Sequence, residues 1–456
     1  MLPKKTIQEI LQQLVDQNTE KVKLAVTDMD GILRGKIMSF DKFRAVVENG
    51  FGFCDVVFGW DAGDQAYDNV SYTGWHSGYP DAKASVDVQT FRQIPWENDI
   101  PLFLADFRDV NADALPICPR SLLKNIRSRA AKAGYNCSFS QEFEWFNFIN
   151  NTEQLYASKF SALQPMTQGM FGYSVLRASQ NSEYFNSLFD GMNKFGVPLE
   201  GLHTETGPGV YEAAILYSDI LEAADRAVLF KAGTKEIAHR HGFIASFMAK
   251  PNEQLPGCSG HVHQSLWTKD GKQNVFFDKK KSSGISSLME SYIAGQLYCL
   301  PHILPMFAPT VNSYKRLVEG AWAPTTITWA IDNRTTALRA LPGSASSTRL
   351  ETRVVGSDSN PYLAMAGCLA AGLFGIQQKM KLKIPATKGS GYQDKKNGIL
   401  PANLWEASQA MKSSPVAREL FGDAFVDHFT STREWEWRQF SKKVTDWELQ
   451  RYLEII

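Results

Sequence analysis

Acidic and aromatic side chains alternate in residues 141–146, which read Gln-Glu-Phe-Glu-Trp-Phe. Successive side chains of a β-strand point to opposite faces, so Glu142 and Glu144 share one face while Phe143 and Trp145 share the other. Two adjacent carboxylates that point into a fold need a cation to keep both of them ionised. The pattern therefore fits either a divalent-metal site or an exposed strand with two solvated glutamates, and the rest of the chain must decide between them.

Length and charge limit the class of protein. A chain of 456 residues exceeds the size of a single hydrophobic core, so we expect two domains. Its 48 basic residues balance 48 acidic ones, which gives no reason to expect nucleic acid or an anionic membrane as a partner. The six cysteines form no Cys-x-x-Cys pair, which favours free thiols and a cytoplasmic protein. The longest apolar stretch, 362–376, is too short to span a bilayer and predicts a buried helix.

The first quarter of the chain predicts a small α+β domain. Segments 23–28 and 35–39 flank an Asp-Gly turn and predict a β-hairpin. Residues 51–79 are rich in glycine, aspartate and aromatic side chains, which is typical of a functional loop. Two prolines precede a predicted helix at 121–133, so we place the domain boundary there and expect an N-terminal domain at 1–112 and a catalytic domain at 113–456.

Two further elements of the catalytic domain carry metal-ligand chemistry. Glu205 and Glu212 flank a Gly-Pro-Gly turn that could fold both carboxylates toward one point. His261 and His263 form a His-x-His pair after a glycine-rich turn, and strand spacing puts both imidazoles on one face. Together with the first acidic pair, this mixture of oxygen ligands and imidazole suits Mg²⁺ or Mn²⁺ better than zinc.

The last element is rich in arginine. Guanidinium groups bind phosphate and carboxylate oxygens in a bidentate manner, so five arginines close in sequence suit a bound polyanion. The alternative for any one of them is a salt bridge at a subunit interface. Phosphoryl transfer and ATP-driven ligation are the classes that this composition permits, and no Gly-x-x-x-x-Gly-Lys-[Ser/Thr] loop is present. The arginines are Arg316, Arg334, Arg339, Arg349 and Arg353.

Taken together and in this order, these motifs resemble the glutamine synthetase family along the whole catalytic region. The resemblance implies an α+β fold with a small N-terminal β-grasp domain and a large C-terminal catalytic domain, whose curved antiparallel sheet is flanked by helices. It also implies a homo-oligomer, a double ring of ten or twelve subunits with active sites between neighbours. The motifs are Glu142-Phe143-Glu144, Glu205 with Glu212, residues 260–266, residues 312–317, Asn333-Arg334, and residues 349–353 followed by 360–363.

The resemblance implies two sets of ligands for Mg²⁺ or Mn²⁺, with two or three ions at each active site and ATP as co-substrate. Acidic side chains dominate both sets. By position, Glu144, Glu205 and Glu212 would hold one ion, and Glu142, His261 and Glu351 would hold a second.

The remaining roles concern the substrates. Arg316, Arg353 and the backbone of Gly257 would bind glutamate, and Arg334 would stabilise the transferring phosphoryl group. In the family a loop aspartate of the adjacent subunit helps to deprotonate the incoming ammonium; Asp61 is the first candidate here and Asp64 the second. The side chains implied around ATP are His263, Ser265, Arg339 and Arg349.

The sequence departs from the ammonia-using pattern at one position. Ammonia-using members carry a glutamate two residues before the proline of a Gly-x-Glu-Ala-Pro segment, whereas this chain has Trp322 before Pro324. An indole cannot accept a proton from ammonium, but it can pack against an organic amine or face a cationic amine. The segment resembles the branch that ligates glutamate to polyamines or other amines. Pro256 replaces an asparagine that contacts glutamate in many members, which leaves the amino-acid substrate open.

The sequence thus predicts an ATP-dependent γ-glutamyl ligase that prefers a polyamine or another primary amine to ammonia. Two alternatives remain open. The first is a true glutamine synthetase in which another carboxylate, such as Glu319, replaces the missing glutamate. The second is a ring-forming protein that has lost catalysis, although such a protein would have no physical reason to keep so many clustered like charges.

Overall fold

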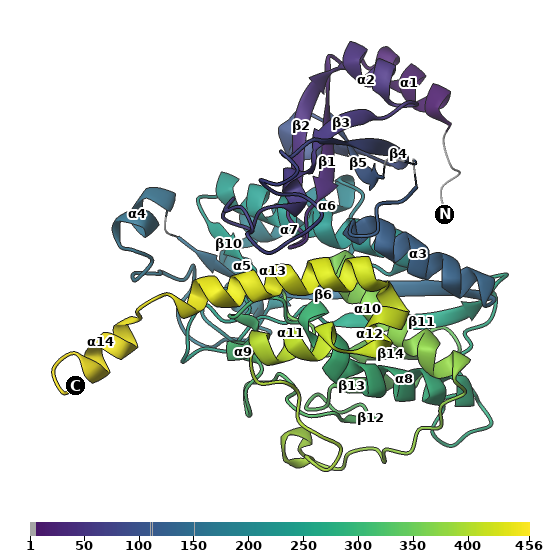
Figure 1. Cartoon of the computed structure of the whole chain (residues 1–456), viewed down its shortest axis with the longest axis vertical. Coiled ribbons are helices and arrows are strands. Elements are labelled where there is room, and N and C mark those ends of the chain that lie inside the picture. Colours follow the sequence, from purple (N-terminus) through teal and green to yellow (C-terminus); the bar gives the residue numbers. More distant parts are fainter. Residues whose placement is uncertain (1–5, 110, 112, 150) are drawn as a thin grey trace.

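The computed structural model describes residues 6–109, 111, 113–149 and 151–456. Its first sheet has five strands in the order β2-β1-β5-β4-β3, with β1 and β5 parallel and the other pairs antiparallel. This sheet lies at one end of the molecule with α1 and α2 beside it (Figure 1). The elements are α1 Ile7–Asp16, β1 Lys21–Thr27, β2 Leu33–Ser39, α2 Phe40–Val46, β3 Phe51–Cys54, η1 Asp55–Phe58, β4 Asp81–Ile94, η2 Pro95–Glu97 and β5 Ile100–Arg108.

The pairing of β1 with β2 confirms the predicted hairpin. Its turn is closed by Asp28, whose carboxylate accepts hydrogen bonds from the backbone N–H groups of Asp30 and Ile32 at 3.0 and 2.9 Å. Gly31 has a φ of +79°, and a Cβ there would lie 3.0 Å from the Cα of Asn360. Glycine therefore allows the hairpin tip to approach Asn360, which directly precedes helix α10 (Pro361–Gln377).

A second, nine-stranded sheet forms the centre of the molecule, in the order β12-β13-β14-β11-β6-β8-β7 with β9 and β10 also paired to β6. Its pairs are antiparallel except for β12 with β13. The two sheets with their helices confirm the predicted α+β class. The strands are β6 Tyr135–Phe148, β7 Leu199–Thr204, β8 Val210–Ile215, β9 Ser218–Asp219, β10 Ile244–Ser246, β11 Val262–Thr268, β12 Trp329–Ile331, β13 Leu338–Leu341 and β14 Arg349–Thr352.

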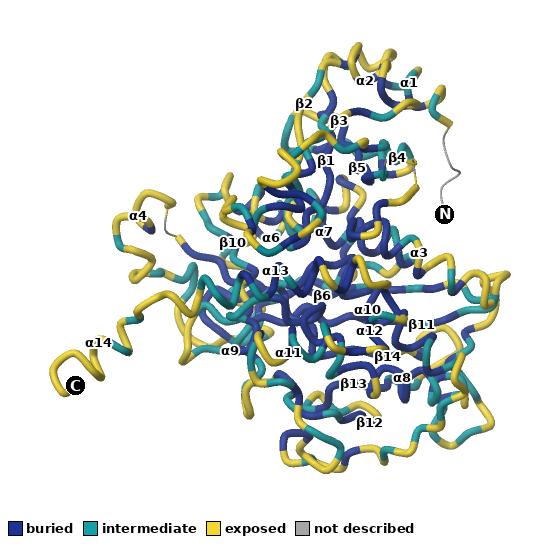
Figure 2. Tube along the Cα trace, viewed as in Figure 1, coloured by how far each residue is buried: buried dark blue, intermediate teal, exposed yellow. Residues whose placement is uncertain are grey.

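Helices cover the second sheet, and the predicted helix at 121–133 corresponds to α3. Buried residues concentrate around β6 and α10, whereas α14 projects from the body with no buried residue (Figures 1 and 2). The helices are α3 Pro119–Lys132, α4 Thr152–Ala157, α5 Val175–Gln180, α6 Ser182–Lys194, α7 Ile220–Arg240, α8 Ser287–Ile303, η3 Leu304–Met306, α9 Ser313–Arg316, α10 Pro361–Gln377, η4 Gly391–Gln393, α11 Leu404–Lys412, α12 Pro415–Phe421, α13 Asp423–Ser441 and α14 Asp446–Tyr452.

Helix α10 is the apolar stretch that the sequence predicted as a buried helix, and nearly all of its side chains are inaccessible. It packs so closely on α8 that a Cβ added at Gly295 or Gly375 would lie 2.3 or 2.1 Å from a carbonyl oxygen of the other helix. Glycine at both positions therefore permits the contact. Among the described residues, no helix is both long and apolar enough to cross a membrane. All six cysteines are free, as predicted.

A buried ionic network joins the first sheet to the helices. Arg120 of α3 donates to both carboxylate oxygens of Asp225 on α7 at 2.8 Å and to Asp106 on β5 at 3.0 Å. Tyr362 of α10 donates its hydroxyl to Asp225 at 2.7 Å. Between β5 and α3 lies the predicted boundary at 112/113, where residue 112 is outside the described residues, and this division stays a prediction.

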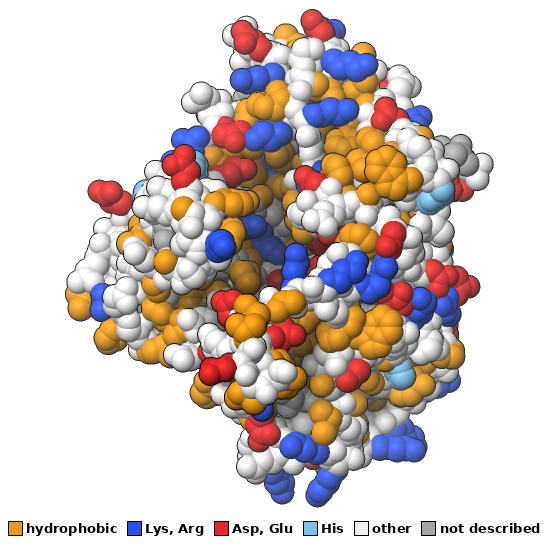
Figure 3. Space-filling model, turned by 60° about the vertical axis from the view of Figure 1, so that its left-hand side comes forward, with side chains coloured by type: hydrophobic (Ala, Val, Ile, Leu, Met, Phe, Trp, Pro, Cys, Tyr) orange, Lys and Arg blue, Asp and Glu red, His pale blue; other side chains and the backbone are white. Residues whose placement is uncertain are grey.

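The predicted functional loop at 51–79 begins as β3 and η1 and then packs against α13. Asn69 donates its side-chain amide to the carbonyl of Ser431 at 2.7 Å, and Arg438 pairs with Asp68. On one face, the molecule is hollowed between its upper and lower parts, and acidic and basic side chains surround the hollow (Figure 3).

Candidate active site

Strand β6 carries Glu142 and Glu144 on the face of the sheet that also receives side chains from β8 and β11. Phe143 and Trp145 on its other face are fully buried. Their rings lie 5.8 and 5.6 Å from that of Phe230 on α7, centroid to centroid. This packing fixes which way the strand faces. The glutamates are only partly exposed, so the alternative of an exposed, solvated strand is wrong.

The first cluster gathers Glu142 of β6, His263 of β11, Glu351 of β14 and His261, which directly precedes β11. Glu142 lies 2.8 Å from Nδ1 of His261 and 3.2 Å from Nε2 of His263, and Nδ1 of His261 lies 3.4 Å from Glu351. One ligand atom from each of Glu142, His263 and Glu351 falls within 4.8 Å of the others. His263, which the resemblance placed at ATP, therefore lies among the candidate metal ligands as well.

The protonation states in the first cluster favour binding of a cation, with Glu142 ionised and His261 neutral. Burial alone would raise the pKa of Glu142, but the charge of His263 and hydrogen bonds from both imidazoles hold it well below its ordinary value. Burial, followed by the charge of Arg353, lowers the pKa of His261 to about 4, so its imidazole is neutral at pH 7. Its buried Nε2 has no hydrogen-bond partner among the described residues, which leaves this nitrogen free for a metal ion.

The second cluster contains Glu144, His203, Glu205 and Glu212. Nε2 of His203 lies 3.2 Å from Glu212, and its Nδ1 lies 3.7 Å from Glu205. Burial, followed by the charge of Glu212, raises the pKa of Glu144 to about 8. Oε2 of Glu205 is buried with no hydrogen-bond partner in the described part of the chain. A divalent cation would fit these carboxylates, because it would remove their mutual repulsion.

The sequence interpretation missed His203. It lies directly opposite Glu212 in the pairing of β7 with β8 and stacks on Tyr173, with the ring centroids 4.5 Å apart. The signal was present, because His203 and Glu205 follow the same two-residue spacing that drew attention to Glu142 and Glu144.

Other protein groups hold Arg339, Arg349 and Arg353 against the first cluster, and they also hold Arg316, whose charge acts on Glu144. Arg339 donates to Glu351 at 2.9 Å and Arg353 forms a very short contact with the same carboxylate. Arg349 donates to Nδ1 of His263 at 3.2 Å, and Arg316 is buried against the carbonyls of Val354 and Arg353.

Arg334 differs from the other arginines. It is exposed, and its backbone carbonyl accepts a hydrogen bond from Nε of Arg353 at 3.0 Å. Its positive charge acts on the hydroxyl of Tyr173, beside the second cluster. This exposed guanidinium is available for a ligand.

Next to the first cluster lies a cavity of about 300 Å³. Glu142, His263, Ser265 and Arg349 line it, and the hydroxyl of Ser265 accepts a hydrogen bond from Nε1 of Trp267 at 3.0 Å. Arg339, also predicted for ATP, lies on Glu351 and outside this lining. The structure thus brings three of the four predicted ATP residues together in one cavity.

Gly257 lies in the segment that leads into His261 and β11. A Cβ there would lie 2.5 Å from the carbonyl oxygen of Ala249 and 2.9 Å from Cγ of Arg316, so no larger residue fits without a shift. The close approach places the Gly257 backbone against the arginine that the resemblance assigned to glutamate.

The two loop aspartates face other partners within the same chain. Asp61 accepts hydrogen bonds from Nε1 of Trp435 at 2.9 Å and from the backbone N–H of Gly63 at 2.8 Å. Asp64 pairs with Arg34 at 2.9 Å. Within the described chain, neither of these two carboxylates contacts either cluster.

Trp322 lies in an irregular segment between α9 and β12. Its φ is +59°, a left-handed conformation that is uncommon outside glycine, and its side chain is 61% exposed. Glu319 is also exposed and lies 3.7 Å from Nζ of Lys395. The indole is therefore free to contact a ligand, whereas the nearest candidate replacement carboxylate has a lysine partner.

A known protein family and several known proteins are similar to this chain. Residues 116–452 match the family described as "Glutamine synthetase, catalytic domain". The chain is 53% identical to Type-1 glutamine synthetase 2 of Dictyostelium discoideum, over 98% of this chain and 86% of that protein. It is 35% identical to the glutamate–isopropylamine ligase of a Pseudomonas species, over 99% of both chains.

One more relative and one solved structure are also similar to this chain. The chain is 34% identical to the gamma-glutamylethanolamide synthetase GlnA4 of Streptomyces coelicolor, over 98% of this chain and 96% of that protein. The solved structure of a GmaS/ADP complex matches with a TM-score of 0.84 and 28% identity, over 97% of this chain and 99% of that one.

Proposed function

The chain belongs to the glutamine synthetase family, and on this premise we propose that it joins the side-chain carboxylate of glutamate to an organic amine in preference to ammonia. As a member of this family, it is an ATP-dependent glutamate–amine/ammonia ligase. The preference for an organic amine is the part that we propose.

Trp322 is the observation that carries the proposal. Its indole offers a large apolar surface and a π face but no carboxylate, so it can pack against an alkyl amine and cannot take a proton from ammonium. Its exposure leaves that surface free for a ligand. Two of the relatives are named for amine products, isopropylamine and ethanolamine derivatives of glutamate, which supports the same direction.

The reaction has two steps. ATP transfers its γ-phosphoryl group to the glutamate carboxylate, which gives γ-glutamyl phosphate and ADP. The amine nitrogen then attacks the acyl carbon, loses a proton and expels inorganic phosphate. A carboxylate is a poor electrophile, so the first step makes the second possible, and bound Mg²⁺ or Mn²⁺ would neutralise charge on the phosphoryl oxygens.

The chain's own side chains would bind and orient the substrates. The two carboxylate clusters would hold two or three metal ions, since buried ligand atoms of His261 and Glu205 lack partners in the described chain. Arg316 and Arg353, fixed by backbone carbonyls and by Glu351, would present their guanidinium groups to glutamate.

The nucleotide and the transferring group would use the remaining predicted residues. The cavity lined by His263, Ser265 and Arg349 would take ATP, with Arg339 nearby on Glu351. Arg334 is exposed, so its guanidinium would be available to neutralise the transferring phosphoryl group.

Amine deprotonation would require a neighbouring subunit. Among the described residues, the carboxylate of Asp61 contacts Gly63, Gln65 and Trp435 and neither cluster, so we propose that it serves an adjacent subunit's site within a double ring. Mixing an Asp61→Asn protein with a Glu144→Gln protein tests this, because mixed oligomers would contain some intact sites and regain activity. No recovery after subunit exchange would contradict it.

The test of the proposed reaction uses purified protein with ATP, Mg²⁺, glutamate and a panel of amines that includes ammonia, alkylamines, ethanolamine and polyamines. Phosphate release gives kcat/KM, and mass spectrometry identifies the product. We expect at least one organic amine to exceed ammonia. Ammonia equal to or better than every organic amine would overturn the preference.

The relative at 53% identity is named a glutamine synthetase, which favours ammonia as the second candidate acceptor. Glu319 would then have to leave Lys395 and replace the missing carboxylate. Saturation of the rate at millimolar ammonium, and its loss in Glu319→Gln, would support this second reading.

A further inference from the structure

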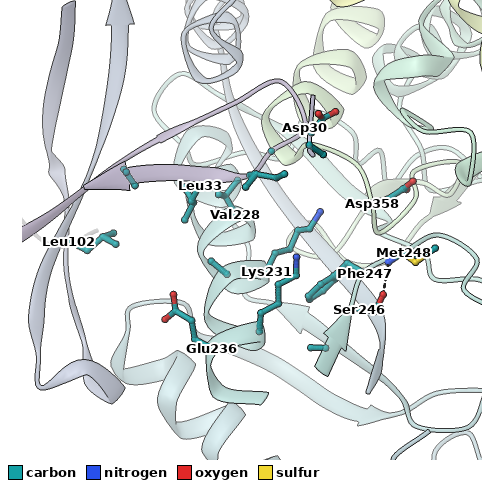
Figure 4. Close-up of a pocket in the computed structure, with 18 of the residues that line it drawn as sticks. Asp30, Leu33, Leu102, Val228, Lys231, Glu236, Ser246, Phe247, Met248 and Asp358 are labelled. Atoms are coloured by element: carbon teal, nitrogen blue, oxygen red, sulfur yellow. Dashed lines mark hydrogen bonds between the residues drawn. The ribbon is translucent and has the colours of Figure 1, made fainter. Parts of the chain in front are cut away.

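A second cavity, of about 840 Å³, lies between the first sheet and the outer face of α7 and β10. Figure 4 shows Lys231 reaching from α7 into the space between Asp30, Phe247 and Asp358. None of the predicted metal, ATP or glutamate residues lines it, so it is separate from the candidate active site. Its walls come from β1, the β1–β2 turn, β2, α7, β10 and α13.

Two lysines of α7 share this cavity. Lys231 and Lys235 are four residues apart, so both side chains lie on one face of the helix, and like charges at this spacing repel each other. Lys231 donates to the carbonyl oxygen of Ser359 at 3.0 Å. Burial, followed by the charge of Lys235, lowers the pKa of Lys231 to about 7. The fold thus places two lysine side chains of the same helix face in the cavity, with Lys231 half-buried and Lys235 exposed.

Aromatic rings support the ammonium groups from one side. Nζ of Lys231 lies 5.7 Å from the ring centroids of both Phe143 and Phe247, and Nζ of Lys235 lies 5.9 Å from that of Phe247. Such contacts orient a cation and leave its other donors free.

Four carboxylates of the described chain line the cavity, and all of them are bonded to other groups, but the buried Oδ1 of Asp358 has no hydrogen-bond partner among the described residues. Glu436 accepts a hydrogen bond from the backbone of Val311. Asp30 pairs with Arg433 at 2.7 Å, and Glu236 accepts a hydrogen bond from Nε1 of Trp96 at 2.6 Å. Oδ2 of Asp358 accepts from the hydroxyls of Thr310 and Ser313. In the described chain neither lysine forms an ion pair within 4.0 Å, although the charges of Asp30 and Asp358 act on Lys231 from a longer distance.

We propose that this cavity binds a small-molecule anion, through a carboxylate or phosphate group held between the ammonium groups of Lys231 and Lys235. An anion at this position would remove the repulsion between the two lysines and supply the acceptors that their free N–H groups lack. The cavity has the size of small-molecule sites, and its remaining walls are largely apolar, including Leu24, Val228 and Ile244.

The anion site would lie directly behind the candidate active site. Phe143, which contacts Lys231, is the residue between Glu142 and Glu144 on β6. Ser357, two residues before the carbonyl that accepts from Lys231, donates its hydroxyl to the backbone carbonyl of Glu144 at 2.6 Å. An anion bound in the cavity would therefore affect the position of β6, the strand that carries Glu142 and Glu144. Binding at this site would in that way regulate the active site.

The test is lysine-resolved chemical labelling of the full-length protein, read by mass spectrometry, with inorganic phosphate or succinate as the probe anion. Succinate tests for a carboxylate ligand and phosphate for a phosphorylated one. We expect at least one probe at millimolar concentration to protect Lys231 and Lys235, while Lys315 and Lys250, which lie outside the cavity lining, keep their labelling rates. Lack of protection by both probes would overturn the proposal.

Calorimetric titration of variants supplies the second readout. Lys231→Gln and Lys235→Gln should each weaken binding of the protecting probe about tenfold, as expected for losing one charge-assisted hydrogen bond. The matched control is Lys36→Gln, because Lys36 lines the same cavity but donates to the carbonyl of Gly52 at 3.1 Å. Equal affinity in all three variants would mean that the probe binds elsewhere and would overturn the assignment. This outcome is independent of which amine the ligase uses.

Discussion

Glu144 on β6 and Glu212 on β8 are direct partners across an antiparallel strand pair. Side chains at such positions are nearest neighbours, and like charges directly opposite each other are destabilising. Burial and the charge of Glu212 raise the pKa of Glu144 to about 8. The fold therefore contains a carboxylate pair that is unfavourable by itself and that a divalent cation would stabilise.

The first prediction concerns the metal-free protein. Since the folded-state pKa of Glu144 is raised from 4.5 to about 8, its contribution to stability is present below pH 4.5 and is lost as the pH rises through about 8. Urea unfolding in EDTA should show a smaller free energy of unfolding at pH 8 than at pH 5. Glu144→Gln should show a flatter pH dependence, and an unchanged slope would contradict the origin that we give for it.

Divalent metal should reverse this behaviour. Mn²⁺ should raise the melting temperature of the wild-type protein, because it binds the folded state and not the unfolded one. In Glu144→Gln the increase should be much smaller. The same increase in both proteins would place the metal away from Glu144.

The second prediction concerns His203, which sits between Glu205 and Glu212. His203→Ala should weaken Mn²⁺ binding about 10- to 100-fold, the usual effect of removing a group that positions metal ligands. The control is His239→Ala, since His239 is exposed on α7. Calorimetric Mn²⁺ titration measures both, and an unaffected His203→Ala protein would separate this histidine from the metal site.

The third prediction concerns the ionic network that joins the first sheet to the helices. Arg120→Met would remove the guanidinium shared by the buried carboxylates of Asp106 and Asp225, which would keep Lys124 and the hydroxyl of Tyr362 as partners, and should cost about 3–5 kcal/mol of unfolding free energy. Arg127→Met is the matched control, because Arg127 is exposed and its pair with Asp219 should contribute about 1 kcal/mol or less. Chemical denaturation compares the two, and equal losses would contradict the importance of burial.

The fourth prediction concerns amine selection. Trp322→Glu restores a carboxylate at the position where ammonia-using relatives carry one, so it should lower kcat/KM for organic amines and raise it for ammonia. Trp322→Phe keeps an aromatic surface and should retain the preference for organic amines. A Trp322→Glu protein with an unchanged ratio of kcat/KM values would show that another group selects the amine.

Strand alternation was enough to identify the central strand β6, and the order of the motifs was enough to predict the fold class. The pairing of distant strands was not available from sequence. Only the register of β7 with β8 puts His203 opposite Glu212, and only the packing of the first sheet on α7 creates the cavity around Lys231. Likewise, the contact of Asp61 with Trp435 joins residues that are 374 positions apart.

Direct competition between acceptors tests the proposed function most simply. Wild-type protein would receive ATP, Mg²⁺, glutamate, and equal concentrations of ammonia and of the best organic amine from the panel, and the two products would be counted by mass spectrometry. We predict that the γ-glutamyl amide of the organic amine exceeds glutamine. Glutamine as the major product would contradict the preference that we assign to Trp322.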